Sequence, residues 1–222
     1  MKLIYIPKYR NEKRPFKITQ IIQRVILNED VDGLIFLPGY MSSSQGTIQN
    51  FISQMQNLGV KNKTVLLFNG MNGSDHLPLG NNIRDEHLKV FAQNNTILNF
   101  IQEKNLKDHR KMLFFFKCCL KDDLNRSIFI DDLSSFFSSI KIIGMLIGSS
   151  NQSFSTYFST AQKGEADLLM LHDGASFGNY KLDTNDNEEN GKNTLIMATS
   201  NSVSDSDEYF KNILRDIFEN SF

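Results

Sequence analysis

The chain has 222 residues, of which 40% are hydrophobic and 22% charged, and its formal net charge at pH 7 is -1. This length suffices for one well-packed domain, and the composition is too apolar for a disordered chain. No apolar run reaches the roughly 18 residues that a membrane helix needs, and the N-terminus lacks the apolar core of a signal peptide. We therefore expect a single cytoplasmic domain over residues 1–222, with no membrane partner.

Charge is unevenly distributed along the chain. Residues 1–24 contain seven basic residues and one acidic residue, Glu12, whereas the chain from residue 165 onward contains twelve acidic and four basic residues. A basic N-terminal segment suits contacts with the phosphates of a nucleic acid, although a solvated basic surface produces the same pattern.

Helix and strand patterns alternate over the first part of the chain. Apolar residues at three- and four-residue steps predict helices over residues 17–27 and 48–58, the second closed by Gly59. Short apolar runs predict strands over residues 31–37 and 64–68. A strand, helix, strand unit favours a parallel strand pair and an α/β fold.

The later elements follow a less regular order. A polar, acidic segment over residues 173–193, rich in Gly and Asn, predicts a surface excursion. The other predicted elements are a loop at 69–82, a helix at 83–104, a strand at 110–120, a helix at 131–140, a strand at 142–147, a helix through Tyr157, strands at 166–171 and 194–198, and a helix at 209–218.

The cysteines and three of the histidines give no sign of a metal site. Cys118 and Cys119 are adjacent in an apolar segment, a spacing that suits neither an ordinary intrachain disulfide nor zinc, so we expect core or near-core thiols. His76, His87 and His172 lack metal-ligand spacing and are expected on the surface or in loops, with His172 in a hydrogen-bonded turn.

Two polar residues stand at the start of the predicted strand 110–120. His109 and Lys111 are two residues apart, and on a strand such residues project from the same face. The pair can therefore contribute to one site.

A second polar motif, GSSN at residues 148–151, follows the predicted strand 142–147. Its glycine allows close approach of the backbone, and Ser149 and Asn151 can present a hydroxyl and an amide to a phosphate oxygen. Glu165 comes just before the next predicted strand, where a carboxylate can hold a histidine ring through its second nitrogen.

These motifs, in this order, resemble the phospholipase D superfamily, whose members carry HxK, then GSxN on a following strand, then a glutamate. The resemblance covers roughly residues 31–171. It implies a phospholipase D-like α/β/α sandwich with a mixed, mainly parallel central sheet.

The resemblance also implies a role for each motif residue. His109 would be the nucleophile that forms a covalent phosphohistidine, with Glu165 orienting its ring. Lys111 and Asn151 would bind the non-bridging oxygens, and Ser149 would support the phosphate. Members with one motif per chain obtain a second histidine from an identical subunit, which implies a homodimer with one composite active centre. No metal and no other cofactor is implied.

Three features depart from the family pattern. Phe116 stands where the family has an aspartate, which several single-motif restriction nucleases also lack. An insertion over about residues 117–141 separates the two motifs, and its predicted helix could touch substrate, build the dimer or do neither. Glu165 also lies somewhat farther from Asn151 than is usual.

The leading functional interpretation is a metal-independent DNA endonuclease of the restriction type. One alternative is a phospholipase or another phosphodiesterase, and a second is a catalytically silent DNA-binding or assembly subunit. The chain contains no recognisable base-reading motif, so we expect a separate domain or subunit to recognise the target sequence.

Overall fold

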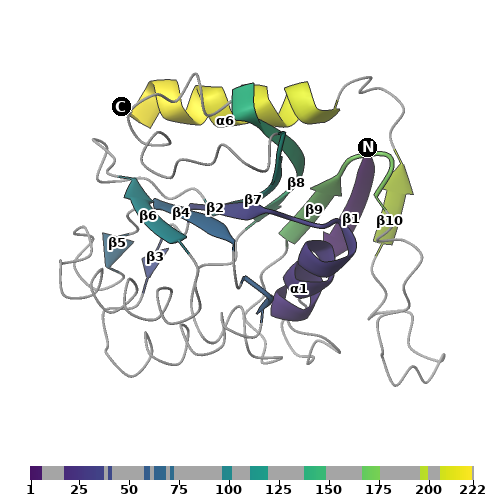
Figure 1. Ribbon diagram of the computed structural model, residues 1–222. Helices are drawn as coiled ribbons and strands as arrows, with labels where there is room; N and C mark the ends of the chain where they lie inside the picture. Colours follow the sequence, from purple (N-terminus) through teal and green to yellow (C-terminus); the bar gives the residue numbers. More distant parts are fainter. Residues whose placement is uncertain are drawn as a thin grey trace.

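The computed structural model describes residues 1–6, 18–37, 40–41, 58–60, 63–68, 71–72, 97–101, 111–119, 138–148, 167–175, 196–199 and 206–221. Within these ranges the chain forms an eight-stranded sheet, a separate pair of short strands and two helices (Figure 1). The helices are α1 (Ile18–Asn28) and α6 (Ser206–Ser221). The sheet strands are β1 (Lys2–Ile6), β2 (Gly33–Leu37), β4 (Thr64–Phe68), β6 (Ile97–Ile101), β7 (Met112–Cys118), β8 (Ile140–Gly148), β9 (Asp167–Leu171) and β10 (Ile196–Thr199), and the separate pair is β3 (Tyr40–Met41) with β5 (Met71–Asn72).

The sheet is mixed but mainly antiparallel, in the order β10-β1-β9-β8-β7-β2-β4-β6. Each neighbouring pair from β10 to β2 is antiparallel, and only β2 with β4 and β4 with β6 are parallel. The parallel pair predicted for residues 31–37 and 64–68 is confirmed, but the predicted mainly parallel α/β/α sandwich is wrong. The reason is that β8 and β9 each pair antiparallel with the strand that precedes them in the sequence. A parallel neighbour would require a crossover connection that returns the chain to the end of the sheet where the preceding strand began.

Several predicted elements differ from the observed ones. No strand was predicted in the basic N-terminal segment, but Lys2–Ile6 forms strand β1. The Lys2 ammonium donates a hydrogen bond to the Ala175 carbonyl. The helix predicted over residues 83–104 is wrong at its end, because Ile97–Ile101 forms a strand parallel to β4. Ile140 begins strand β8 instead of ending the predicted helix 131–140.

Other predictions fall partly or wholly outside the described residues. Gly59 has a φ of 75°, the left-handed conformation expected of a helix-closing glycine, but most of the predicted helix 48–58 is not among the described residues. Residues 120–137 of the predicted insertion and residues 176–193 of the predicted excursion also lie outside them.

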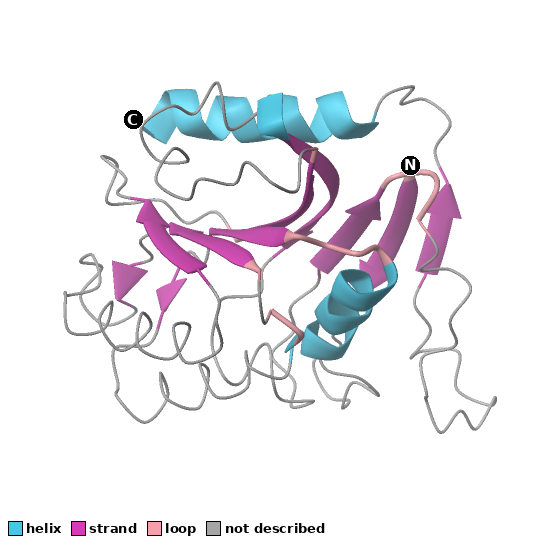
Figure 2. Cartoon of the chain, viewed as in Figure 1, coloured by secondary structure: helices cyan, strands magenta, loops and turns pink. Residues whose placement is uncertain are grey.

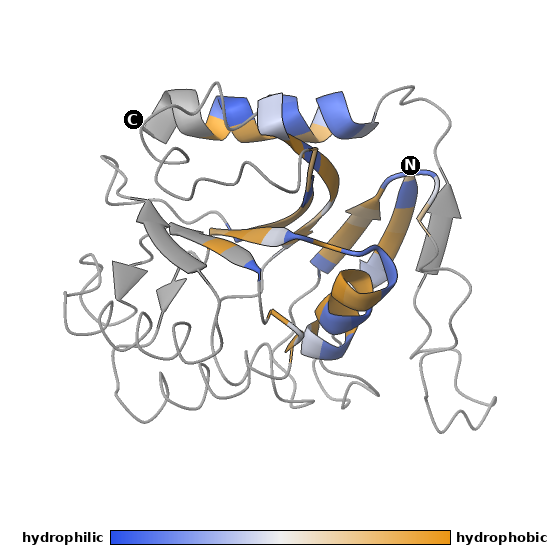
Figure 3. Cartoon of the chain, in the orientation of Figure 1, coloured by the Kyte–Doolittle hydropathy of each residue, from blue (hydrophilic) through white to orange (hydrophobic). Residues whose placement is uncertain are grey.

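The two described helices lie on opposite faces of the sheet (Figure 2). Each of them packs against its own hydrophobic core. Both helices turn their apolar stripes toward the sheet (Figure 3). We call the cluster beside α1 the α1 core; its helical members are Ile18, Ile21, Ile22, Val25 and Ile26. We call the cluster beside α6 the α6 core; its helical members are Phe210, Leu214 and Ile217.

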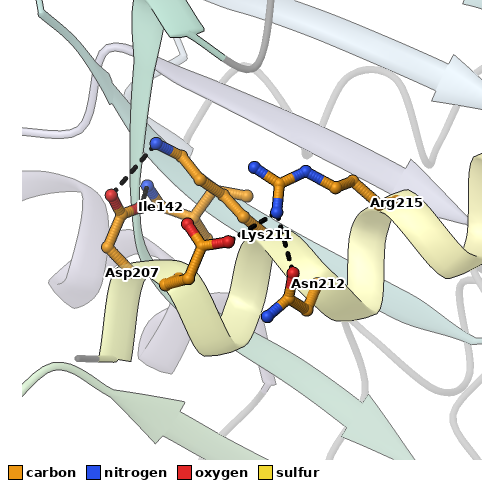
Figure 4. A network of polar contacts seen from close by, with 6 residues as sticks. Ile142, Asp207, Lys211, Asn212 and Arg215 are labelled. Carbon is orange, nitrogen blue, oxygen red and sulfur yellow. Dashed lines mark hydrogen bonds and ion pairs between the residues drawn. The ribbon is translucent and has the colours of Figure 1, made fainter. Parts of the chain in front are cut away.

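A β-bulge in β8 connects the sheet to α6. Phe115 pairs with Gly144 but Phe116 pairs with Ile142, so Ile143 is the additional residue. The Ile142 N–H donates to the Asp207 carboxylate of α6 at 2.6 Å, and Lys211 Nζ lies 3.1 Å from the same carboxylate (Figure 4). The hydrogen bond at the bulge therefore attaches the first turn of α6 to the sheet.

Candidate functional site

The start of β7 and the end of β8 lie side by side at one end of the sheet. Met112 pairs with Ile147, and the backbone N–H of Gly148 donates to the carbonyl of Lys111 at 3.3 Å. Lys111 is the lysine of the HxK motif, and Gly148 is the glycine of GSSN. Antiparallel pairing thus brings together these two motif residues, which are far apart in the sequence. We call this the Lys111 end of the sheet.

The start of β9 joins the same end. Asp167 pairs with Gly148 on one side and with Ile6 of β1 on the other. Lys111, Gly148, Asp167 and Ile6 therefore form a transverse row across four neighbouring strands (Figure 1).

Strand alternation gives the face on which each member of this row lies. Leu113 and Phe115 belong to the α1 core, so Lys111, two residues before Leu113, is on the α1 face. Leu169 and Leu171 belong to the same core, which places Asp167 on this face too. Lys111 is half-buried and Asp167 is 3% exposed. Gly148 lies between them and adds no side chain.

Of the five predicted site residues, the structure describes only Lys111. His109, Ser149, Asn151 and Glu165 lie outside the described residues. The structure thus brings together Lys111 and the glycine before Ser149, and gives no geometry for the other four predicted residues.

Phe116 is a core residue. Its side chain is fully buried and belongs to the α6 core, on the face opposite that of Lys111. Phe116 therefore contributes to packing of the sheet against α6.

Asp167 is a polar residue that the sequence analysis did not select. It is 3% exposed, and aspartate is seldom buried to this extent unless it is paired. The signal in the sequence was an acidic residue directly before the apolar run 168–171. Glu165, two residues earlier, matched the family order and was preferred for that reason.

The opposite end of the sheet holds a histidine–carboxylate pair. His172 Nε2 lies 3.0 Å from Glu29 Oε2, and Glu29 is 6% exposed. The predicted turn at His172 is confirmed, because Ala175 N–H donates to the His172 carbonyl at 3.1 Å. The pairing of its ring with Glu29 was not predicted, and it joins the end of α1 to the end of β9. His76 and His87 lie outside the described residues.

The two cysteines also lie at this opposite end. Cys118 is half-buried against the α6 core, as expected, but Cys119 is exposed. The Cys118 backbone N–H donates to the Asp32 carboxylate at 2.8 Å. Burial, and then the nearby Asp32 and Cys119, raise the pKa of the Cys118 thiol to about 11. This thiol is therefore protonated at neutral pH and is a weak nucleophile.

Across the described part of the chain, no group of three or more His, Cys, Asp or Glu residues has the geometry to hold a metal ion. Neither described helix combines the length and the apolar character needed to span a membrane.

Comparison of the whole chain with protein-family models found no match, and none of the curated proteins matches it. The similarity to the phospholipase D superfamily therefore depends on the motif residues alone.

Proposed function

We propose that this protein is a metal-independent phosphodiesterase that cleaves DNA through His109. The observation that carries the proposal is the pairing of β7 with β8, which sets Lys111, two residues after His109, directly opposite Gly148, which precedes Ser149. Antiparallel pairing of these consecutive strands places the start of β7 beside the end of β8, so Lys111 and Gly148 meet although 36 residues of chain separate them.

The proposed reaction proceeds in two steps through the residue roles that the resemblance implies. An imidazole nitrogen of His109 forms a bond to phosphorus while the bond to the leaving oxygen breaks, and a second histidine protonates that oxygen. Water then attacks the phosphohistidine, gives its proton to the second histidine, and frees His109. Lys111 and Asn151 neutralise the charge on the non-bridging oxygens in both steps.

DNA is the proposed substrate because of the basic N-terminal segment. Strand β1 ends at Ile6, which pairs with Asp167, so the chain enters the basic stretch from the Lys111 end of the sheet. Lys8 and Arg10 follow Ile6 directly in the sequence. Lysine and arginine that neutralise backbone phosphates supply most of the affinity of nonspecific DNA binding.

The second histidine is proposed to be His109 of an identical subunit. One chain carries one GSxN motif, preceded on the neighbouring strand by the HxK of His109 and Lys111, and a two-fold axis would bring two copies of this set to one phosphate. A separate recognition domain or subunit is proposed to select the target sequence.

Cleavage of supercoiled plasmid DNA in excess EDTA tests this function. We expect nicked and linear products from the unmodified protein, and a loss of about 10²–10³-fold or more in rate for His109→Ala and for Lys111→Met. Acid-labile phosphate should be trapped on His109 during turnover and detected by mass spectrometry.

The chain offers a matched control for Lys111 on the same strand. Lys117 is also half-buried and lies on the same face of β7, but at the opposite end of the sheet, so Lys117→Met should leave cleavage unchanged. Cleavage that survives in His109→Ala would refute the proposed nucleophile. A lipid panel assayed in parallel tests the phospholipase alternative, and salt-dependent DNA binding without cleavage would indicate a silent binding subunit.

A further inference from the structure

The exposed thiol of Cys119 lies on a part of the sheet that the proposed function does not use. Its backbone N–H donates to the Ser139 carbonyl at 2.8 Å, so the pairing of β7 with β8 continues to this residue. Cys118 packs against the α6 core, and strand alternation therefore places Cys119 on the α1 face, where it is exposed. This end of the sheet is opposite to the Lys111 end.

Two lysines face each other beside this thiol. Lys117 of β7 pairs with Lys141 of β8, and both lie on the α1 face, because the residues that flank them belong to the α6 core or pack against it. Directly opposite residues on antiparallel strands have Cβ atoms about 5 Å apart. Cys119 follows Lys117 by two residues and is diagonal to Lys141, which places it about 7 Å from each.

Neither lysine is neutralised by an ion pair within the described residues. No described carboxylate lies within ion-pair distance of the ammonium of Lys117 or Lys141. Asp32 lies beside the end of β7, where its N–H donates to the Phe116 carbonyl at 2.9 Å, and its carboxylate accepts a hydrogen bond from the Cys118 N–H at 2.8 Å. Two positive charges beside one negative charge leave a net positive potential around the Cys119 thiol.

We propose that Cys119 is a modification site for small anionic disulfides such as glutathione disulfide, which the Lys117–Lys141 pair attracts to the thiol. The Cys119 thiol loses its proton to water, and the thiolate sulfur attacks one sulfur of the disulfide. The disulfide bond of the reagent breaks as the new one forms, so Cys119 ends in a mixed disulfide and the released thiolate takes up a proton. No oxidant other than the disulfide itself is needed.

Cys118 should not react in this way. Its thiol is half-buried and its pKa is raised to about 11, so little of the nucleophilic thiolate is present at neutral pH. The site is also independent of the proposed phosphodiesterase, because the lysine pair and Lys111 lie at opposite ends of β7. Neither Lys117 nor Lys141 is expected to take part in DNA cleavage.

Reaction rates with disulfides of opposite charge test the proposal on the full chain. The probes are the anionic dithiobis(nitrobenzoate) and the cationic cystamine. A lysine about 7 Å from the thiol changes the local concentration of a singly charged reagent about threefold at low salt. Lys117→Met and Lys141→Met should therefore each slow the anionic probe about threefold and accelerate cystamine by a similar factor, and added salt should remove both differences.

Lys111→Met is the matched control, because Lys111 is a half-buried lysine on the same strand and face but at the other end of the sheet, and both rates should stay unchanged. After incubation with glutathione disulfide, peptide mass spectrometry should find the mixed disulfide on Cys119, and Cys119→Ser should abolish it. Preferential modification of Cys118 would overturn the proposal. So would an equal ratio of anionic to cationic rates in Lys141→Met and in the unmodified protein.

Discussion

Gly144 is a position in the sheet where a single methyl group should matter. A Cβ atom at this position would lie 2.5 Å from Leu171 Cδ2 and 2.6 Å from the Met170 carbonyl oxygen. The leucine end can rotate away, but the carbonyl belongs to the backbone of β9. We expect Gly144→Ala to reduce the free energy of unfolding by about 1–3 kcal/mol, because β8 and β9 must separate to admit it. Urea denaturation measures the change.

Gly174→Ala is the control for that substitution. A Cβ at Gly174 meets only the His172 ring, at 3.3 and 3.4 Å, and the residue is exposed in a turn. Its effect should stay below that of Gly144→Ala. Equal effects would indicate that glycine's backbone freedom, and not the close approach of β8 and β9, determines stability at both positions.

At the level of the elements, the attachment of α6 to the bulge of β8 depends on Asp207. Its carboxylate accepts a hydrogen bond from Ile142 N–H at 2.6 Å and lies near Lys211 (Figure 4). Asp207→Ala leaves the strand N–H without this acceptor, and should cost about 1–3 kcal/mol of unfolding free energy. Amide hydrogen exchange should increase in α6 before it increases in the centre of the sheet.

Glu208 provides a neighbouring acidic residue for comparison. It is exposed, and its carboxylate lies 2.5 Å from Arg215 Nη1 on the same helix. Surface ion pairs of this kind contribute little, so Glu208→Ala should cost less than about 1 kcal/mol. Equal losses of unfolding free energy in Asp207→Ala and Glu208→Ala would show that the hydrogen bond between Asp207 and Ile142 contributes no more than a surface ion pair.

The elements also show which patterns a sequence can predict. Helix α1 and strands β4 and β9 were predicted within a residue or two, because their apolar periodicity is strong and local. Ile97–Ile101 was predicted as helix since its apolar residues fit both periods, and its strand conformation comes from pairing with β4. The bulge in β8 likewise depends on partners in β7 and α6.

The arrangement of the whole sheet explains why the site could be predicted only in part. The motif residues could be chosen from the sequence, because HxK and GSxN are local patterns. The burial of Asp167 could not, because it depends on β9 pairing with both β8 and β1. The mainly antiparallel order of the sheet was missed for the same reason: strand direction follows from long-range pairing, which apolar periodicity does not encode.

The complete molecule is proposed to act as a homodimer, and mixing experiments can test that stoichiometry. If two copies of His109 serve one phosphate, a dimer with one His109→Ala subunit lacks either nucleophile or acid and should be inactive. Unmodified and His109→Ala proteins, unfolded together in equal amounts and refolded, would then retain about a quarter of the activity of the same total amount of unmodified protein, because random pairing yields that share of intact dimers.

Independent monomers would instead retain about half of the activity, since each unmodified chain would act alone. Lys117→Met protein mixed in the same way should cause no loss, which controls for the refolding step. A linear dependence on the unmodified fraction would require the leaving-group proton to come from within one chain. A quadratic dependence would place two subunits at one active centre, and would explain how a chain with one GSxN motif and one proposed nucleophile carries out a reaction that needs two histidines.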